Sequence, residues 1–155
     1  MGLKAFLELN LYNDSFYGSI PYSINGLVSL QLLDLSENYL EGPIPHGIGN
    51  LTSMWVFLAH SNNLSGTLPT SLANCTQLQV LDLRKNGFSG ELPQYFTFFY
   101  DLKILSLGYN NLHGFIPQHI TNLTRLRVLD LVHHERLSRF SKFQIVEQLG
   151  KLKLK

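Results

Sequence analysis

Cysteine is nearly absent from this 155-residue chain, which holds Cys75 alone and therefore cannot form a disulfide within itself. Charged residues are also sparse, at 15%, and the formal net charge is +1, so no basic excess indicates a nucleic-acid partner. No apolar run approaches the roughly 18 residues that a membrane-spanning helix needs. No secretory signal peptide is recognisable at the N-terminus. We therefore expect a folded chain without a disulfide framework, a nucleic-acid partner or a membrane span.

Motifs that carry catalysis or hold metal ions are missing as well. His134 and Glu135 resemble the start of a zinc-binding HExxH motif, but Ser138 stands where the second histidine is needed. There is no glycine-rich phosphate loop, no CxxC or GxSxG motif and no protein-kinase signature. The sequence therefore predicts a protein that is not an enzyme, with no cofactor and no metal ion.

The most regular feature of the sequence is a pattern that returns every 24 residues. In residues 78–93, Leu81 and Leu83 alternate with Asp82, as in a short strand with one apolar face. An asparagine, a glycine and a proline then follow at fixed spacing. The asparagine position holds Asp14, Asn38, Asn62, Asn86 and Asn110; the glycine position holds Gly18, Gly42, Gly66, Gly90 and Gly114; and the proline position holds Pro21, Pro45, Pro69, Pro93 and Pro117. A fixed period of this length is typical of a solenoid.

Each repeated position has a physical role. Leucines recur on the inward side because one coil cannot bury its own apolar edge and must share a core with its neighbours. An asparagine amide at the bend can both donate to and accept from backbone groups that would otherwise be unpaired. Glycine permits backbone angles closed to other residues, and proline ends the strand and steers the chain to the back of the coil. Cys75 replaces a leucine in an apolar column, which predicts a buried thiol.

Read together as LxxLxLxxNxLxGxIPxxLGxL, these positions resemble the plant-specific subtype of the leucine-rich repeat family from about Leu3 to Leu131. The resemblance implies an α/β-type solenoid, a right-handed superhelix with a parallel β-sheet on the concave face and short 3-10 or helical segments on the convex face. It predicts one repeat domain over residues 1–131, with about five full coils and the strand of a sixth. Ectodomains of this family usually carry paired cysteines in caps at both ends. Neither cap is recognisable here, so the resemblance implies an interior segment of a longer receptor or a truncated gene product.

The resemblance also implies a function. The family includes ectodomains of plant receptor-like kinases and receptor-like proteins, which perceive signals in defence or development. It therefore implies a peptide or protein ligand, a co-receptor as a further partner, and a parent protein that is secreted or lies at the extracellular face of the plasma membrane. Three alternatives stay open: a secreted inhibitor of a cell-wall hydrolase, similar to polygalacturonase-inhibiting proteins, an intracellular scaffold, and a truncated product without a function of its own.

The concave strand face is the candidate binding site. Side chains between the inward leucines point to that face and stack across coils about 5 Å apart. One such column reads Asn10, Asp34, Leu58, Asp82, Ser106 and Asp130. A rigid sheet with varied side chains suits an extended peptide or a protein surface, and aromatic residues and arginine are favoured anchors. The predicted contact residues are Tyr12, Glu37, Trp55, His60, Arg84, Lys85 and Tyr109. A solvated sheet face without a ligand in these coils is the alternative.

Five asparagines stand in the sequence context that accepts an N-linked glycan: Asn13, Asn50, Asn63, Asn74 and Asn122. Three of them, Asn50, Asn74 and Asn122, share one column that we expect on the outer side of the solenoid. Glycans there would leave the strand face free, as a secreted binding protein needs.

Residues 132–155 break the pattern, and we treat them as a divergent basic tail. His134 takes the asparagine position, Arg136 a leucine position and Ser141 the proline position. The tail carries six basic and two acidic residues, and its apolar residues recur at about every third position between Leu137 and Leu152. Three interpretations stay open: a non-homologous tail of mixed helix and disorder, a helical cap, and a basic helix at a membrane surface.

Overall fold

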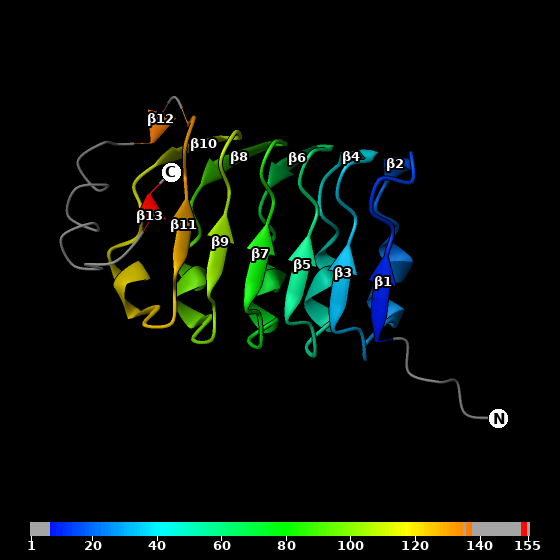
Figure 1. Ribbon diagram of the computed structural model, residues 1–155, viewed down its shortest axis with the longest axis horizontal. Helices are drawn as coiled ribbons and strands as arrows, with labels where there is room; N and C mark the ends of the chain where they lie inside the picture. The colour runs from blue at the N-terminus through cyan, green and yellow to red at the C-terminus, as the bar shows by residue number, and fades with distance from the viewer. Residues whose placement is uncertain (1–6, 135, 138–152, 155) are drawn as a thin grey trace.

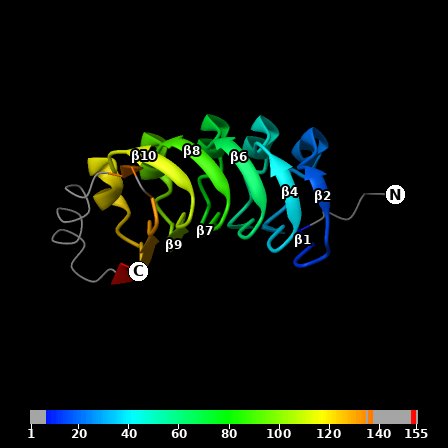
Figure 2. The ribbon, with the colours of Figure 1, turned by 90° about the horizontal axis from the view of Figure 1, so that it is seen from above.

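The computed structural model describes residues 7–134, 136–137 and 153–154, which form a curved stack of coils (Figures 1 and 2). Its first sheet is parallel, with the strand order β1-β3-β5-β7-β9-β11-β13. The strands are β1 (Glu8–Asn10), β3 (Leu32–Asp34), β5 (Val56–Leu58), β7 (Val80–Asp82), β9 (Ile104–Ser106), β11 (Val128–Asp130) and β13 (Lys153–Leu154). From β1 to β11 the register is 24 residues, so Leu9 pairs with Leu33 and Leu105 with Leu129. Figure 2 shows this sheet along the concave side of the arc, as the sequence predicts.

A second parallel sheet, which the sequence did not predict, runs beside the first. Its order is β12-β10-β8-β6-β4-β2. The strands are β2 (Tyr17–Ser19), β4 (Tyr39–Gly42), β6 (Asn63–Thr67), β8 (Gly87–Glu91), β10 (Asn111–Gly114) and β12 (Arg136–Leu137). The register from β2 to β10 is 22 residues, so Gly18 pairs with Leu40 and Gly66 with Phe88. The glycine column lies in these strands with φ between 74° and 86°, which explains why no side chain occupies it.

Among the described residues, five 3-10 turns cover the convex side of the arc (Figure 2). They are η1 (Tyr22–Gly26), η2 (His46–Asn50), η3 (Thr70–Asn74), η4 (Gln94–Phe98) and η5 (Gln118–Asn122). Each turn is preceded by a residue of the proline column; Pro45, for example, has φ −67° and ψ 145°. That extended geometry lets the chain leave the second sheet and enter the turn, the role predicted for this column.

The core is one continuous cluster between the two sheets and the turns. The inward strand residues Leu33, Phe57, Leu81, Leu105 and Leu129 are fully buried. At the first coil Leu9 and Leu11 are half-buried, and Phe16 is 45% exposed. At turn η4 the aromatic residues divide between core and surface, because Phe96 and the following Phe99 are buried while Phe98 is exposed.

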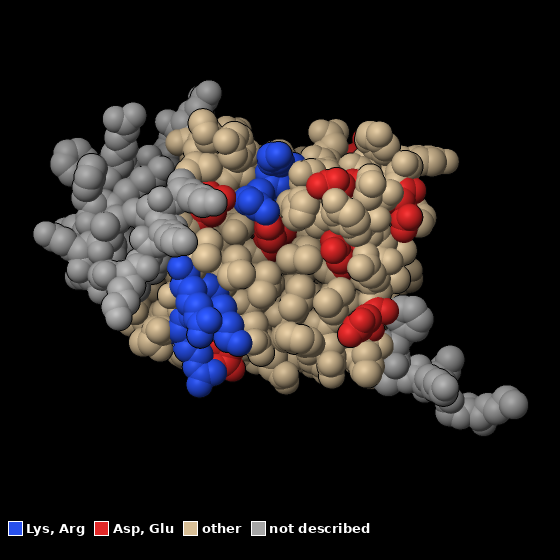
Figure 3. Space-filling model, in the orientation of Figure 1, with Lys and Arg blue, Asp and Glu red and all other residues tan. Residues whose placement is uncertain are grey.

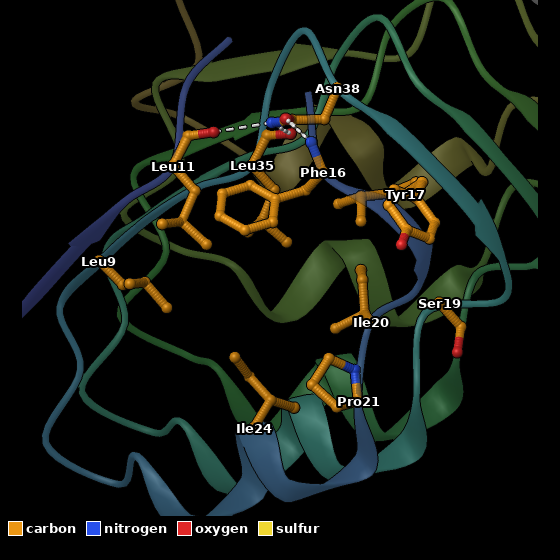
Figure 4. Close-up of a pocket in the computed structure, with 11 residues that line it drawn as sticks. Leu9, Leu11, Phe16, Tyr17, Ser19, Ile20, Pro21, Ile24, Leu35 and Asn38 are labelled. Atoms are coloured by element: carbon orange, nitrogen blue, oxygen red, sulfur yellow. Dashed lines mark hydrogen bonds between the residues drawn. The ribbon is translucent and has the colours of Figure 1, made fainter. Parts of the chain in front are cut away.

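The open end of this core forms a cavity of about 290 Å³ at the first coil. Figure 4 shows Leu9, Leu11, Phe16, Ile20 and Ile24 directed towards it. These are core positions that no neighbouring coil covers among the described residues. The cavity is therefore the end of the shared core, and we do not assign it a ligand.

The asparagine column forms a hydrogen-bonded ladder that ties each coil to the one before it. The Oδ1 atom of Asn38 accepts from the N–H of Phe16 at 2.8 Å, and its Nδ2 donates to the carbonyls of Leu11 at 2.7 Å and Leu35 at 3.0 Å. Figure 4 shows this residue above Leu11 and Phe16. The same arrangement recurs at Asn62, Asn86 and Asn110. The predicted alignment of this column is confirmed, and the exposed Asp14 begins it at the first coil.

The described parts of the tail continue the solenoid further than the sequence indicated. His134 is buried, and its Nδ1 accepts from the N–H of Leu112 at 3.3 Å, as asparagine does in earlier coils. Strand β12 pairs with β10, and β13 pairs with β11, both in parallel. In each pair the register differs by one residue from that of the earlier strand pairs in the same sheet. The helix considered for the tail falls mainly on residues 138–152, which lie outside the described residues, so the boundary at residue 131 remains a prediction.

Burial makes Cys75 a probe of unfolding. The side chain is fully buried as predicted, its Sγ donates to the carbonyl of Ile48, and desolvation raises the pKa of the thiol to about 12. Because the thiolate is the reactive form, iodoacetamide at about pH 8 should label the native chain at least about a hundredfold more slowly than the chain in concentrated urea. Equal labelling rates, followed by mass spectrometry, would contradict this packing.

Candidate functional site

The concave sheet presents an aliphatic stripe formed by the first residue of successive strands. Because side chains alternate along each strand, the residues beside the inward leucines face the hollow of the arc. Five of them are half-buried and apolar: Leu32, Val56, Val80, Ile104 and Val128. The first coil has the exposed Glu8 in the same position. The sequence analysis did not single out this stripe, although its 24-residue spacing was readable. This stripe is an apolar surface on which the side chains of a ligand could pack.

The column that contains Asp34, Asp82 and Asp130 comes next along the strands. Its carboxylates have a structural role and are not simply available to a ligand. Asp34 accepts from the N–H of Ser36 at 2.9 Å, and Asp82 and Asp130 accept in the same way from Arg84 and Val132. Asp82 and Asp130 are buried. Aspartate suits this position because its short side chain can satisfy the backbone N–H two residues further on, where the strand ends.

The seven predicted contact residues lie at two edges of the concave sheet. Six of them follow the strand ends of five coils, and Trp55 alone precedes its strand at the opposite edge. Tyr12, Trp55 and Tyr109 are 47%, 39% and 48% exposed. The structure therefore brings one row together: Tyr12, Glu37, His60, Arg84, Lys85 and Tyr109. His60 and Arg84 are half-buried in it, while Glu37 and Lys85 are exposed.

One position of this row has an unusual backbone in every coil. Its residues have φ between 53° and 58°, the left-handed region, yet none is glycine: Asn13, Glu37, Ser61, Lys85, Tyr109 and His133. Residues other than glycine rarely adopt this backbone conformation. Each residue that does so lowers the stability of the fold, and the surrounding contacts must offset that cost. The bend turns a variable side chain outward once per coil. Because six different residues fill the position, sequence pattern alone could not reveal it.

Aromatic residues of this row interact with neighbouring coils in two places. The rings of Tyr109 and His133 stack with centroids 4.3 Å apart and an interplanar angle of 26°, a partner the sequence analysis missed. At the other end of the sheet, the Glu37 carboxylate raises the pKa of Tyr12, mainly because it accepts a hydrogen bond from the phenol. The Tyr109 ring is thus held by the neighbouring coil, while the Tyr12 phenol is influenced by the Glu37 carboxylate of the next coil.

Arg84 is held within the sheet. Its Nε lies 2.9 Å from Oδ1 of Asp82, and its terminal nitrogen lies 2.7 Å from Oδ2 of the same carboxylate. This bidentate pairing raises the pKa of Arg84. The two residues stand two apart on one strand face, so the pairing was readable from the sequence. Arg84 can offer a ligand its remaining donors, but its charge is largely compensated by Asp82.

The surface has no feature of a metal centre or a membrane span within the described residues. No group of three histidine, cysteine, aspartate or glutamate side chains there could hold a metal ion. No helix in the same part of the chain is both long and apolar enough to cross a membrane. All five asparagines of the glycan-acceptor sequences are exposed; Asn50, Asn74 and Asn122 end turns on the convex side, and Asn13 lies at the edge of the concave face. Glycosylation itself remains a prediction.

Comparison with known proteins gives the family. Leucine rich repeat family models match residues 76–137 and 29–51. The leucine-rich repeat ectodomain of the receptor kinase SOBIR1 from Arabidopsis thaliana superposes with a TM-score of 0.80 at 30% identity, over 84% of this chain and 71% of that one. The chain belongs to the leucine-rich repeat family. A comparison with curated protein sequences found no match.

Longer plant receptors contain the same fold. The ectodomain of the plant membrane receptor kinase GASSHO1/SCHENGEN3 from Arabidopsis thaliana, in complex with CASPARIAN STRIP INTEGRITY FACTOR 2, matches with a TM-score of 0.88 at 34% identity. The plant peptide hormone receptor RGFR1, in complex with RGF2, matches with a TM-score of 0.85, also at 34% identity. Both matches cover 96% of this leucine-rich repeat chain, which spans 18% and 25% of those ectodomains. The chain is thus a plant-type leucine-rich repeat solenoid.

Proposed function

We propose that this chain is a ligand-recognition segment from the ectodomain of a plant receptor-like kinase or receptor-like protein. The observation that carries the proposal is the concave sheet, where an apolar stripe is bordered by a row of exposed aromatic and charged side chains. Similar ectodomains have been solved with a peptide or a co-receptor bound. The segment binds without catalysis, and signalling belongs to other parts of the parent receptor.

The proposed contacts are the row Tyr12, Glu37, His60, Arg84, Lys85 and Tyr109 together with Trp55. Support comes from their placement, since all seven border the concave sheet. An extended peptide would cross the strands with its side chains against the aliphatic stripe and its polar groups against the row. The parent protein lies at the extracellular face of the plasma membrane, which agrees with the exposure of all five glycan-acceptor asparagines.

A peptide selection tests this proposal. Linear heptapeptides displayed on phage would be selected against the full chain and then measured as free peptides. Substitution Val80→Glu, in the middle of the stripe, should weaken the selected peptides at least about tenfold, because a carboxylate would replace an apolar contact. Glutamate is compatible with this position, which Glu8 fills in the first coil.

The matched control is Ser65→Glu, at an exposed position in the middle of β6 on the second sheet. It adds the same charge away from the concave face and should leave binding unchanged. Selected peptides that tolerate Val80→Glu but are lost with Ser65→Glu would place binding on another face. A selection that yields no peptide binder would also count against the proposal.

A further inference from the structure

Charge is separated along the solenoid. Between residues 5 and 83 there are six acidic residues and no lysine or arginine. From residue 84 to residue 134 there are five basic and three acidic residues. Figure 3 shows the concave side, with acidic groups gathered over the first coils and basic groups over the later ones. The hollow of the arc is therefore polarised from end to end.

Pairing within the sheet leaves the two ends uncompensated. The ion pairs found among the described residues are Arg84–Asp82 and Arg125–Asp101. Lys85 and Arg127 have no carboxylate partner within that part of the chain, and Lys103 donates to the neutral Oε1 of Gln79 at 2.7 Å. Three cations thus remain available at coils four to six.

The first two coils show the opposite situation. Glu8 and Glu37 are exposed and Asp34 is half-buried, and no lysine or arginine of the described residues pairs with any of them. The carboxylate of Glu37 is further associated with the phenol of Tyr12. A cationic group placed here would meet several carboxylate oxygens with no competing cation.

We infer that the concave face binds an extended dipolar peptide, with its cationic end over coils one and two and its anionic end over coils four to six. This inference rests on the proposed function and specifies its ligand. Five steps of about 4.8 Å separate β1 from β11, or roughly 24 Å, which an extended peptide spans with about seven residues. Exposed charges of this kind set orientation and association rate more than affinity.

One column provides an internal test. Glu37 and Lys85 occupy the same position two coils apart, with φ of 54° and 53°, so each coil accepts either side chain. The double substitution Glu37→Lys with Lys85→Glu weakens the polarity without changing composition or net charge. Glu41→Lys, at an exposed position of the second-sheet strand β4, is the control for a charge change away from the concave face.

The probes are three heptapeptides with blocked ends and one composition of two lysines, two aspartates, two glycines and a tyrosine. One has its lysines first, one has its aspartates first, and one alternates the charges. With the full chain at low salt, both segregated peptides should bind about fivefold or more tightly than the alternating one. Higher salt should reduce this difference. A photoreactive group at the lysine end should cross-link to residues 7–38 in both segregated peptides.

The double charge swap should weaken both segregated peptides about tenfold while the alternating peptide and the control variant change less than about twofold. Equal affinity for all three peptides, or cross-links from the lysine end to coils five and six, would overturn the inference. If peptides selected for the concave face still bind, the proposed function survives that result. Absence of binding by the segregated peptides at about 1 mM, while selected peptides bind, overturns the inference in the same way.

Discussion

Replacing Asn110 with alanine is expected to lower the free energy of unfolding by about 3 kcal/mol. This side chain is buried, and its Oδ1 accepts from the N–H of Phe88 at 3.0 Å. Its Nδ2 donates to the carbonyls of Leu83 and Leu107, both at 2.9 Å. Alanine would leave these backbone groups without their partner in a place that water reaches poorly, so the cost exceeds that of one surface hydrogen bond.

The neighbouring asparagine provides the control. Asn111 is exposed at the start of β10, so Asn111→Ala should change stability by less than about 0.5 kcal/mol. Urea unfolding followed by circular dichroism compares the two variants with the unaltered chain. Because coils interact mainly with their neighbours, a broadened transition would indicate that Asn110→Ala uncouples coils four and five. Equal destabilisation by the two substitutions would refute the ladder.

The second large effect is expected at Gly49 in turn η2. A Cβ atom there would lie 2.4 Å from the backbone oxygen of Ser71 and 2.7 Å from the Cβ of the same residue. The obstacle is backbone, so a rotamer change cannot relieve it, and turns η2 and η3 must separate. We expect Gly49→Ala to destabilise the chain by about 2–3 kcal/mol, as overpacked sites do.

Gly26 is the matched control for this substitution. It ends turn η1, no heavy atom lies within 4 Å of its would-be Cβ, and its φ lies outside the strained region. Gly26→Ala should therefore be neutral or slightly stabilising, because alanine restricts the unfolded chain. Thermal melts of the two variants measure the difference. If Gly49→Ala melts at the same temperature as the unaltered chain, the close approach of the two turns is incorrect.

The sequence predicted those parts of the structure in which one residue type has one physical role. The asparagine ladder, the glycine column and the proline column appear where the 24-residue period places them. A repeated identity is informative because each coil meets the same constraint. Gly49 shows the limit: the equivalent positions hold Asn25, Ala73, Thr97 and Thr121, so the steric need is local to η2 and η3.

The binding face was predictable in place but not in detail. Alternation along the strands placed the varied side chains in the hollow of the arc. It did not indicate that Asp82 and Asp130 would be buried as caps of their strand ends, or that His133 would stack on Tyr109. Those features depend on backbone bends at each strand end, which no repeated residue type marks. The second sheet was missed for a related reason, because its strands begin with residues that vary from coil to coil.

The concave face as the binding surface is tested most directly by methyl NMR of the full chain during titration with a selected heptapeptide. We predict that shifts concentrate on the methyl groups of Val56, Val80, Ile104 and Val128. The chemical shifts of the buried methyl groups of Ile48, Leu72 and Ile120, which lie in the convex turns, should not change. Shifts confined to the convex turns or the second sheet, with the aliphatic stripe unchanged, would contradict the account.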